Sequence, residues 1–469
     1  MKRMATEKIE PRVVGAVVAT GLMSLSGVII ETAMNVTFPT LMKQFGVTTG
    51  TVQWMTTLYL LIVACIVPIS SYLKRRFKMK QLFVTANLLF IAGVLVDALA
   101  PTFSWLLLGR VVQAIGTGIA LPLMFNIILE QVPLSRIGMM TGVGTLITAV
   151  GPAIGPTYGG ILVTNFNWRY IFWILLPFLI ISFFVGVKTV QQVTSMVHER
   201  FDLLSMLTIV ATFAGLIYGF SSLGSQPFFS WAVLGAWVVG VLGLIGFIWR
   251  SRRVAQPLIK LAAVENGAFA WHLLAFFLIQ TTALGLSFIL PNYLQLVDHQ
   301  TAFVAGLVVL PGAVIGAAFS PIGGQILDRF GARKPILLGL SLMTVSLIVM
   351  TGFAHHLAAL TVLGLYIIYM VGIGVAFGNV MTAGIKQLSA DLKADGNALM
   401  NAMQQFAGAL GTAIVSMIIS TSQASGQGSV MVKTAIGSQW ALLVLVITAG
   451  LALLSMLMAF RVSRPTASR

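Results

Sequence analysis

The stretch GPAIGPTYGG, residues 151–160, lies in an apolar run that carries no charged residue between Arg136 and Arg169. One membrane-spanning helix is therefore expected to contain two prolines and four glycines, namely Gly151, Pro152, Gly155, Pro156, Gly159 and Gly160. Inside a helix in water, each proline costs about 3 kcal/mol and each glycine about 1 kcal/mol relative to alanine. Three of the glycines recur every four residues and share one helix face, so a second helix backbone is expected to pack closely there. The alternative is an ordinary packing face of small residues.

The composition indicates a membrane protein with many spans. Apolar residues make up 58% of the chain and charged residues 9%, and the mean hydropathy is +0.97, far from the averages of soluble proteins. A helix of about 20 apolar residues crosses a hydrocarbon layer of about 30 Å. We expect fourteen such segments, at residues 13–36, 52–73, 81–100, 105–129, 138–163, 168–188, 203–223, 230–250, 268–291, 303–324, 335–354, 358–380, 397–421 and 439–460. A count of twelve would require dismissing the two apolar segments between 203 and 250.

The charged residues are distributed unevenly between the two sides of these segments. The chain has 28 Lys and Arg against 12 Asp and Glu, an excess that in another protein could indicate nucleic-acid binding. With both termini on one side, only Lys43, Arg169 and Lys433 fall in loops on the opposite side, and Arg110 falls within a segment. This asymmetry follows the positive-inside rule and predicts a cytoplasmic N-terminus and an even number of spans. The partner of the chain is then the lipid bilayer, and no nucleic acid is expected.

The sequence has no signature of ATP-driven or redox chemistry. It contains no Gly-x-x-x-x-Gly-Lys-Ser/Thr loop, no dinucleotide-binding glycine fingerprint after a strand and no His-Glu-x-x-His. Cys65 is the only cysteine, so no disulfide can form within the chain, and a metal site is not expected. Neither an enzymatic activity nor a cofactor is expected.

Further motifs are similar to those of one transporter family. Residues 324–334 read GQILDRFGARK, residues 107–118 read LLGRVVQAIGTG and residues 31–39 read ETAMNVTFP. These resemble the loop signature of the major facilitator superfamily, the Arg-x-x-Gln-Gly-x-Gly pattern of its fourth helix and the first-helix motif of its drug exporters. GPAIGPTYGG resembles the antiporter motif on their fifth helix. Along essentially its whole length, the chain resembles the fourteen-span drug:proton antiporters of this family.

The motifs depart from the family pattern at specific positions. The loop at residues 71–80, SYLKRRFKMK, is a partial second copy of the signature in which Arg75 stands where the acid is expected. Two extra residues follow Gln113 before the glycine of its motif. The first-helix acid is Glu31, whereas the family commonly has Asp at the position of Ile30. A shift of one residue turns a side chain by about 100° around the helix.

The resemblance implies an all-α polytopic fold in which two six-helix halves flank two inserted helices and both termini are cytoplasmic. The corresponding division is into residues 1–200, 201–260 and 261–469, and repeated halves of this kind build a site near the middle of the membrane. The family's gating roles carry over to the Gly-Pro helix at 151–160 and to the loop residues Asp328, Arg329, Gly331 and Arg333. Positive-inside anchoring is the alternative reading of the loop.

Proton coupling is assigned to Glu31 and Arg110 by the same resemblance. A charge within the hydrocarbon region is costly and by default marks a functional site. The alternatives are that Arg110 snorkels to the interface or that the two residues form a static ion pair. The remaining acids are expected near segment ends or in loops, in solvated or capping roles; they include Asp97, Glu130, Asp202, Asp298, Asp391 and Asp395.

Polar and aromatic residues of the segments could line an adaptable cavity for lipophilic cations. The candidates are Asn35, Tyr59, Gln113, Asn126, Gln280, Phe288, Tyr369, Asn379 and Gln404, with simple helix packing as the alternative for each. The chain is thus interpreted as a monomeric exporter of hydrophobic, cationic drugs driven by protons in a bacterial cytoplasmic membrane. Export of a lipid or an amphipathic natural product, and a non-transporting receptor or assembly factor, remain the alternatives.

Overall fold

The computed structural model describes residues 9–133, 137–192, 202–223, 226, 229–254, 257–355, 357–389, 392–425 and 428–462. In these ranges the regular secondary structure is entirely helical. The long helices of the first part of the chain are α1 (Pro11–Phe45), α3 (Trp54–Ile66), α5 (Met79–Leu99), α6 (Phe103–Gln131), α7 (Ile137–Asn165) and α8 (Tyr170–Thr189). They are followed by α9 (Leu203–Ser222), α10 (Trp231–Arg253), α12 (Gly267–Leu296), α13 (Ala302–Phe330), α14 (Arg333–Gly352), α15 (Ala359–Ile385), α16 (Lys393–Ala424) and α17 (Val430–Val462). Short pieces are α2 (Thr49–Val52), η1 (Val67–Ile69), α4 (Ser70–Arg76) and α11 (Ala262–Glu265).

The number of long apolar helices agrees with the sequence analysis. Among the described residues, thirteen helical stretches are long and apolar enough to cross a membrane, and α7 is a further helix of 29 residues. Several helices are longer than expected; α1, for example, continues through Pro39 to Phe45. It ends at Gly46, whose φ of 63° is a backbone conformation that favours glycine. The second segment is not continuous, because Pro68 lies in a 3-10 turn between α3 and α4. Proline has no N–H to donate and crowds the preceding turn, which accounts for the break.

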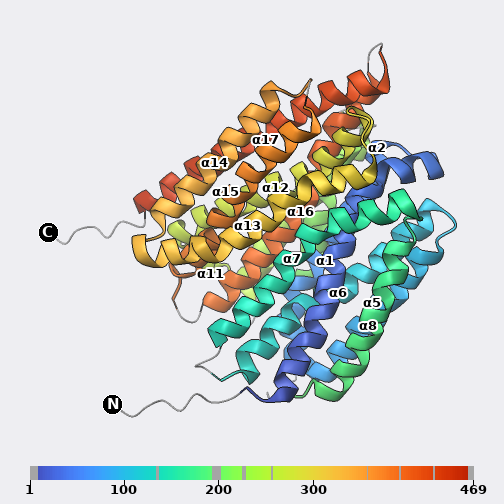
Figure 1. The fold of residues 1–469 in the computed structure, drawn as a ribbon. Helices are drawn as coiled ribbons and strands as arrows, with labels where there is room; N and C mark the ends of the chain where they lie inside the picture. The colour runs from blue at the N-terminus through green and yellow to red at the C-terminus, as the bar shows by residue number, and fades with distance from the viewer. Residues whose placement is uncertain are drawn as a thin grey trace.

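The helices form two groups and one separate pair. α1, α3, α5, α6, α7 and α8 pack against one another, as do α12 to α17, and α9 packs chiefly against α10. The two groups meet where α7 lies against α13 and α3 lies against α16. Figure 1 shows both termini on the same side of the molecule and α2 at the opposite end. We call the end with the termini the terminal end and the end with α2, where the two groups are in contact, the closed end.

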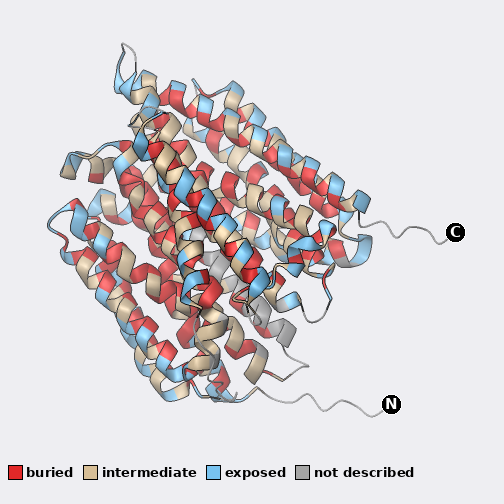
Figure 2. Cartoon of the chain, turned by 180° about the vertical axis from the view of Figure 1, so that it is seen from behind, coloured by how far each residue is buried: buried red, intermediate tan, exposed pale blue. Residues whose placement is uncertain are grey.

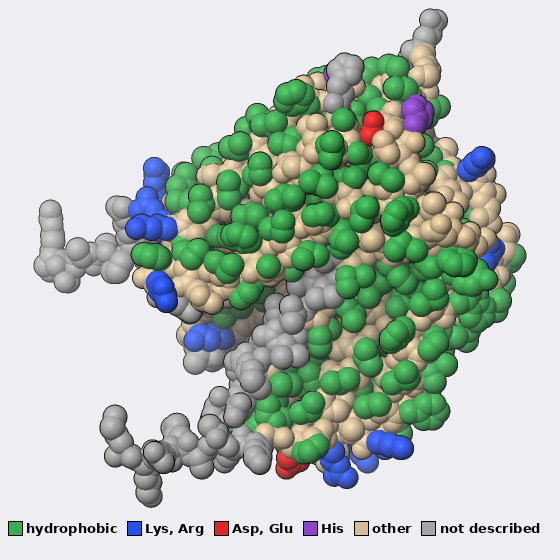
Figure 3. Space-filling view, viewed as in Figure 1, with side chains coloured by type: hydrophobic (Ala, Val, Ile, Leu, Met, Phe, Trp, Pro, Cys, Tyr) green, Lys and Arg blue, Asp and Glu red, His purple; other side chains and the backbone are tan. Residues whose placement is uncertain are grey.

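The surface is that of a protein surrounded by lipid. Buried residues follow the helix faces that meet inside the molecule, and exposed residues follow the outer faces (Figure 2). Hydrophobic side chains cover the broad surface in Figure 3, and Lys and Arg side chains gather at its ends, mostly on the side of the termini. On α10 the exposed side chains are themselves apolar, among them Val238, Leu242 and Ile245. These faces fit the hydrocarbon layer, where water is not available to polar groups.

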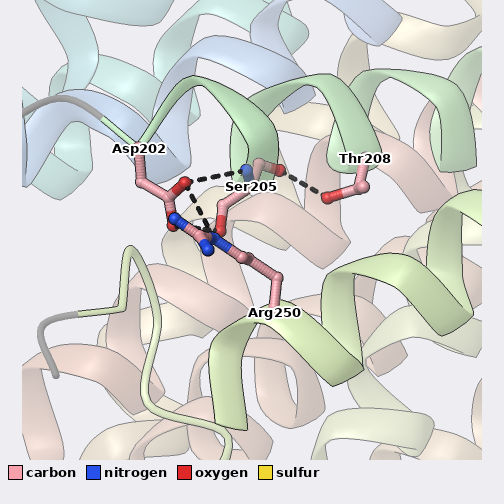
Figure 4. Close-up of polar contacts among 4 residues, drawn as sticks. All are labelled: Asp202, Ser205, Thr208 and Arg250. Atoms are coloured by element: carbon pink, nitrogen blue, oxygen red, sulfur yellow. Dashed lines mark hydrogen bonds and ion pairs between the residues drawn. The ribbon is translucent and has the colours of Figure 1, made fainter. Parts of the chain in front are cut away.

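A polar cluster joins the two helices of the separate pair at the terminal end (Figure 4). Asp202 caps α9 by accepting hydrogen bonds from the Ser205 N–H at 3.3 Å and from the Ser205 hydroxyl at 2.6 Å. Arg250 of α10 donates through Nε to both carboxylate oxygens, at 3.2 and 3.3 Å. Burial alone would raise the pKa of the Asp202 carboxyl, but the bonds from Ser205 and Arg250 outweigh it and hold the pKa below its ordinary value. The capping role expected for Asp202 is confirmed.

Replacing Asp202 with alanine should destabilise the α9–α10 pair. Loss of a helix cap costs about 1 kcal/mol, and the ion pair with the largely buried carboxylate is lost as well. Because the folded-state pKa is depressed, this stabilisation is present above the ordinary pKa of about 3.9 and is lost as the pH falls through the lower folded value. Thermal unfolding of the detergent-purified protein at neutral pH should therefore show a lower midpoint for Asp202→Ala.

Glu265→Gln is the matched control, because Glu265 pairs with Arg252 at 3.8 Å with both side chains 67% exposed. Exposed pairs of this kind contribute little. Equal midpoints for Asp202→Ala and Glu265→Gln would show that the cluster in Figure 4 does not hold the pair together.

Candidate functional site

Arg110 lies inside the first helix group with no exposed surface. Its Nε donates to the Met55 carbonyl at 3.1 Å and its Nη1 donates to Gln113 Oε1 at 2.9 Å. The guanidinium carbon lies 4.1 Å from the centre of the Tyr59 ring, and Nη2 has no hydrogen-bond partner. The snorkelling alternative is wrong, because the side chain is sealed among α3, α5 and α6. The charge is solvated by a carbonyl, an amide and an aromatic face, and not by a carboxylate.

Asp97 is part of the same cluster. It lies on α5, has no exposed surface and accepts a hydrogen bond from Gln113 Nε2 at 2.7 Å through Oδ2. Its other oxygen, Oδ1, has no partner. The expectation that Asp97 is solvated or caps a helix is wrong, because α6 covers this end of α5. Gly109 permits that approach, since a Cβ there would overlap the Asp97 carboxyl.

Glu31 faces the cluster from α1. One helical turn earlier, a Cβ on Gly27 would lie 3.1 Å from both the Tyr59 hydroxyl and the Thr117 hydroxyl, so this face of α1 meets α3 and α6. The Glu31 side chain is partly exposed, and its charge interacts with that of Arg110. Within the described part of the chain, Glu31 and Arg110 form no direct ion pair, so the static-pair alternative does not describe this conformation. Tyr59 donates to Thr117 at 2.8 Å and completes the cluster.

The expected cavity residues divide into those that hold helices together and those that are partly open. Asn35 is buried, accepts from Thr56 at 2.9 Å and donates to Ser287 at 3.1 Å, which ties α1 to α3 and α12. Phe288, also buried, lies 5.6 Å from Phe38 of α1, ring centre to ring centre. Both residues therefore lie in the contact between the two helix groups.

In the second group, Tyr369 and Asn379 are buried among helices. The Tyr369 hydroxyl shares a hydrogen bond of 2.9 Å with Thr282, and Asn379 donates to the Gly323 carbonyl at 2.8 Å. Gln280 and Gln404 are partly exposed, and no hydrogen bond joins them to another described residue.

Asn126, the remaining candidate, is partly exposed beside a small cavity that Lys74 also lines. Close by, Lys74 forms an ion pair with Glu130 at the end of α6. The sequence analysis missed this pair, because the partial loop copy at 71–80 had lost its own acid and Glu130 is far from it along the chain. The spatial closeness of the ends of α4 and α6 supplies the partner.

The complete copy of the loop signature, at residues 324–334, differs from the partial copy at 71–80 in the placement of its charged side chains. Arg329 lies in the last turn of α13 and is exposed, as is Arg333 at the start of α14. Gly331 ends α13 with φ 77°, a conformation that favours glycine. The side chains of Asp328 and Pro152 lie outside the described part of the structure.

The glycine face of α7 packs directly on α1. A Cβ on Gly159 would lie 2.6 Å from the Ala33 carbonyl oxygen, and one on Gly155 would overlap the Thr32 hydroxyl. Gly151 packs against Val28. The backbones of α1 and α7 therefore approach each other with no side chain of α7 between them.

The next residues of α7 meet α13 of the other helix group. A Cβ on Gly160 would overlap the Ala302 carbonyl, and one on Gly306 would overlap the Pro156 carbonyl. Thr157 donates to the Gly306 carbonyl at 3.0 Å, and Thr164 accepts from the Phe303 N–H at 3.0 Å. One helix thus contacts the backbones of both groups.

The contacts between the two groups gather at the closed end. Besides those of α7, Thr57 shares a hydrogen bond of 2.9 Å with Thr412, and Ser416 donates to the Thr49 carbonyl at 3.2 Å. The Thr49 hydroxyl donates to Gln423 Oε1 at 2.7 Å. Each residue lies in the part of its helix farther from the termini. Toward the terminal end, Figure 3 shows the surface hollowed between the two groups.

Comparisons with known proteins identify the family. A family model described as Major Facilitator Superfamily matches residues 20–412. Lincomycin resistance protein LmrB of Listeria monocytogenes is 38% identical over 426 residues, which is 90% of each chain. Lincomycin resistance protein LmrB of Bacillus subtilis is 36% identical over 86% of this chain and 84% of that one. The chain belongs to the Major Facilitator Superfamily, as a multi-pass protein of the bacterial cell membrane.

Further relatives and solved structures are consistent with this family assignment. A multidrug resistance protein B homolog of Mycobacterium tuberculosis is 29% identical over 87% of this chain and 76% of that one. Among solved structures, a bacterial homolog to the human lysosomal transporter Spinster, in an inward-facing and unoccupied conformation, has a TM-score of 0.69 at 15% identity, covering 98% of this chain and all of that one. A D-xylose-proton symporter has a TM-score of 0.64 at 14% identity, covering 97% and 98%. At these identities the likeness concerns the fold alone.

Gly159→Ala should destabilise the protein, because the added methyl group meets the α1 backbone, which cannot move aside as a side chain can. Overpacking of this kind costs about 1–3 kcal/mol. We expect a lower thermal unfolding midpoint and a smaller yield of monodisperse protein in size-exclusion chromatography.

The matched control is Gly378→Ala in α15, where a Cβ meets nothing within 4 Å. Alanine is favoured over glycine in a helix by about 1 kcal/mol, so this variant should be unchanged or slightly more stable. If Gly159→Ala behaved like Gly378→Ala, the close approach of α1 and α7 would not be needed.

Proposed function

We propose that this chain exports lipophilic, cationic drugs from the cell in exchange for protons, as a monomer, by alternating access of a central site to the two membrane faces. The names of the relatives, which include two lincomycin resistance proteins and a multidrug resistance protein homolog, support drugs as the substrates. The observation that carries proton coupling is the fully buried charge of Arg110, which has no carboxylate bonded to it, with the partly exposed Glu31 within its electrostatic reach.

The coupling step follows from this arrangement. An ionised Glu31 balances the charge of Arg110 and attracts a cationic substrate, whereas a protonated Glu31 does neither. A proton and a cation therefore compete for the same carboxylate, and a site that binds one at a time exchanges them. Because Glu31 is partly exposed and Arg110 is sealed, Glu31 is the group that takes up and releases the proton.

The proposed moving parts are the halves at residues 1–200 and 261–469, with residues 201–260 as an inserted pair. The distribution of Lys and Arg supports cytoplasmic termini. The closed end then faces outward, and the hollow in Figure 3 faces the cytoplasm. The Gly-Pro helix α7 and the loop with Asp328, Arg329, Gly331 and Arg333 are the proposed gating elements. The partly exposed Gln280 and Gln404 are the best placed of the substrate-binding candidates.

Glu31→Gln should remove most proton-driven transport, because glutamine keeps the size and the hydrogen bonds of the side chain but cannot ionise. We expect at least a tenfold loss of pH-gradient-driven uptake of ethidium, a lipophilic monovalent cation, into inverted proteoliposomes. Lincomycin serves as a second probe, in line with the names of the relatives. Equilibrium binding of either probe to the purified variant at acid pH should change less than its transport.

Glu265→Gln, which changes an exposed glutamate remote from the cluster, is the control and should transport as the unmodified chain does. Binding of the probes without any flux in the unmodified chain would favour a receptor over a transporter. Flux that does not depend on pH would contradict proton coupling while leaving export intact.

A further inference from the structure

Asp97 is a buried acid that has no role in the proposed coupling step. It has no exposed surface, and only one of its two oxygens accepts a hydrogen bond, from the neutral amide of Gln113. A buried carboxylate is stable only when it is paired with a cation or fully hydrogen-bonded. In the described part of the structure Asp97 has neither, so a proton on the carboxyl is the simplest way to satisfy it.

The charges around Asp97 are few. Arg110 on α6 and Glu31 on α1 are the charged groups of the cluster, and the Tyr59 hydroxyl of α3 donates to Thr117. Just before α8, Arg169 donates to the Ala100 carbonyl at 2.7 Å and covers the Trp168 ring at 4.3 Å.

Of the other cations on helices packed against this region, Arg12 and Lys43 are exposed in the first and last turns of α1, about 28 and 18 Å along the helix from Glu31. Lys80 begins α5 and Lys188 ends α8, which places each about 25 Å along a helix from the level of Asp97 at 1.5 Å per residue. The cluster therefore contains one cation and two carboxyls. With both carboxyls ionised it carries one uncompensated negative charge, and with one proton it is neutral. Because an uncompensated buried charge is costly, the second carboxyl makes the cluster take up its first proton more readily than Glu31 and Arg110 alone would.

Gln113 connects the two sides of the cluster. Its Oε1 accepts from Arg110 and its Nε2 donates to Asp97, so the amide orientation depends on both partners. Arg110 Nη2 and Asp97 Oδ1 both lack partners in this conformation. Each side thus has one unused bonding position, and both would be filled if Arg110 Nη2 turned to donate to Asp97 Oδ1.

We propose that Asp97 is a second proton-binding carboxyl of the coupling site. It shares the charge of Arg110 with Glu31, and both carboxyls take up and release protons as substrate is exchanged. When a proton binds, an O–H bond forms on one carboxyl, and its release restores the carboxylate. This inference rests on the proposed proton coupling and adds a residue to it.

Asp97→Asn tests the proposal, because asparagine keeps the shape and the oxygen that accepts from Gln113 but cannot bind a proton. Without the second carboxyl, the positive charge of Arg110 acts on Glu31 unopposed, and a lower pH is needed to protonate Glu31. The pH of half-maximal ethidium transport should therefore move about one unit lower, as expected for removing one charge near another in a protein interior. Asp298→Asn, in the loop after α12, is the control and should leave the profile unchanged.

Infrared difference spectroscopy on protein in lipid nanodiscs provides a readout that needs no transport. Between about pH 5.5 and 8.5, where exposed carboxyls stay ionised, the unmodified chain should show C=O bands from two protonated carboxyls. Glu31→Gln should lose one band and Asp97→Asn the other. The Glu31→Gln spectrum alone decides the matter if Asp97→Asn does not fold.

The outcomes separate this inference from the proposed function. An unchanged pH profile in Asp97→Asn, or a single band that disappears completely in Glu31→Gln, would leave Asp97 a structural hydrogen-bond acceptor and overturn the inference. In that case a pH-driven flux in the unmodified chain would still support proton-coupled export. Absence of that flux would contradict the proposed function itself.

Discussion

The close contact of α7 with two other helices is the constraint on which the rest of the structure depends. Along residues 151–160, α7 presents glycines to the backbone of α1 and, one residue further, to the backbone of α13. At Gly159 and Gly160 a side chain could be added only by displacing a main chain, and at Gly151 and Gly155 an added Cβ would meet the side chains of Val28 and Thr32. In the proposed mechanism, this contact lets the two helix groups close on each other at one end while the other end opens. In that mechanism, the doubled Gly-Pro pattern marks the helix-helix contact about which the two groups move.

The electrostatics of the charged cluster depend on the same helix contact. Glu31 lies on α1, the helix that α7 packs against, and it faces Arg110, which is held by a carbonyl, an amide and an aromatic ring. A shift of α1 against α6 would change the distance between the two charges and so the affinity for a proton. Inside a low-dielectric interior a small shift of this kind has a large electrostatic effect. In the proposed mechanism, movement of the halves and proton binding are coupled through α1.

The sequence predicts the helical class, the number of long apolar segments and the buried arginine, because each depends on local composition or on a charge within an apolar run. It does not predict the burial of Asp97, because a position near the end of a segment looks solvated until α6 is seen to cover it. The pairing of Lys74 with Glu130 is hidden for the same reason. Asn35 and Phe288 read as cavity residues but lie in the contact between the groups, and only their three-dimensional neighbours distinguish the two.

Paired distance measurements test most directly whether the closed end opens as the terminal end closes. Spin labels at Phe77 and Phe330 report on the terminal end, and labels at Phe166 and Leu360 on the closed end; all four side chains are exposed, and Cys65 would be replaced by serine. A change from alkaline to acid pH, or addition of ethidium, should shorten one distance of the two while the other lengthens. Distances that stay fixed, or that change in the same direction at both ends, would contradict alternating access about α7.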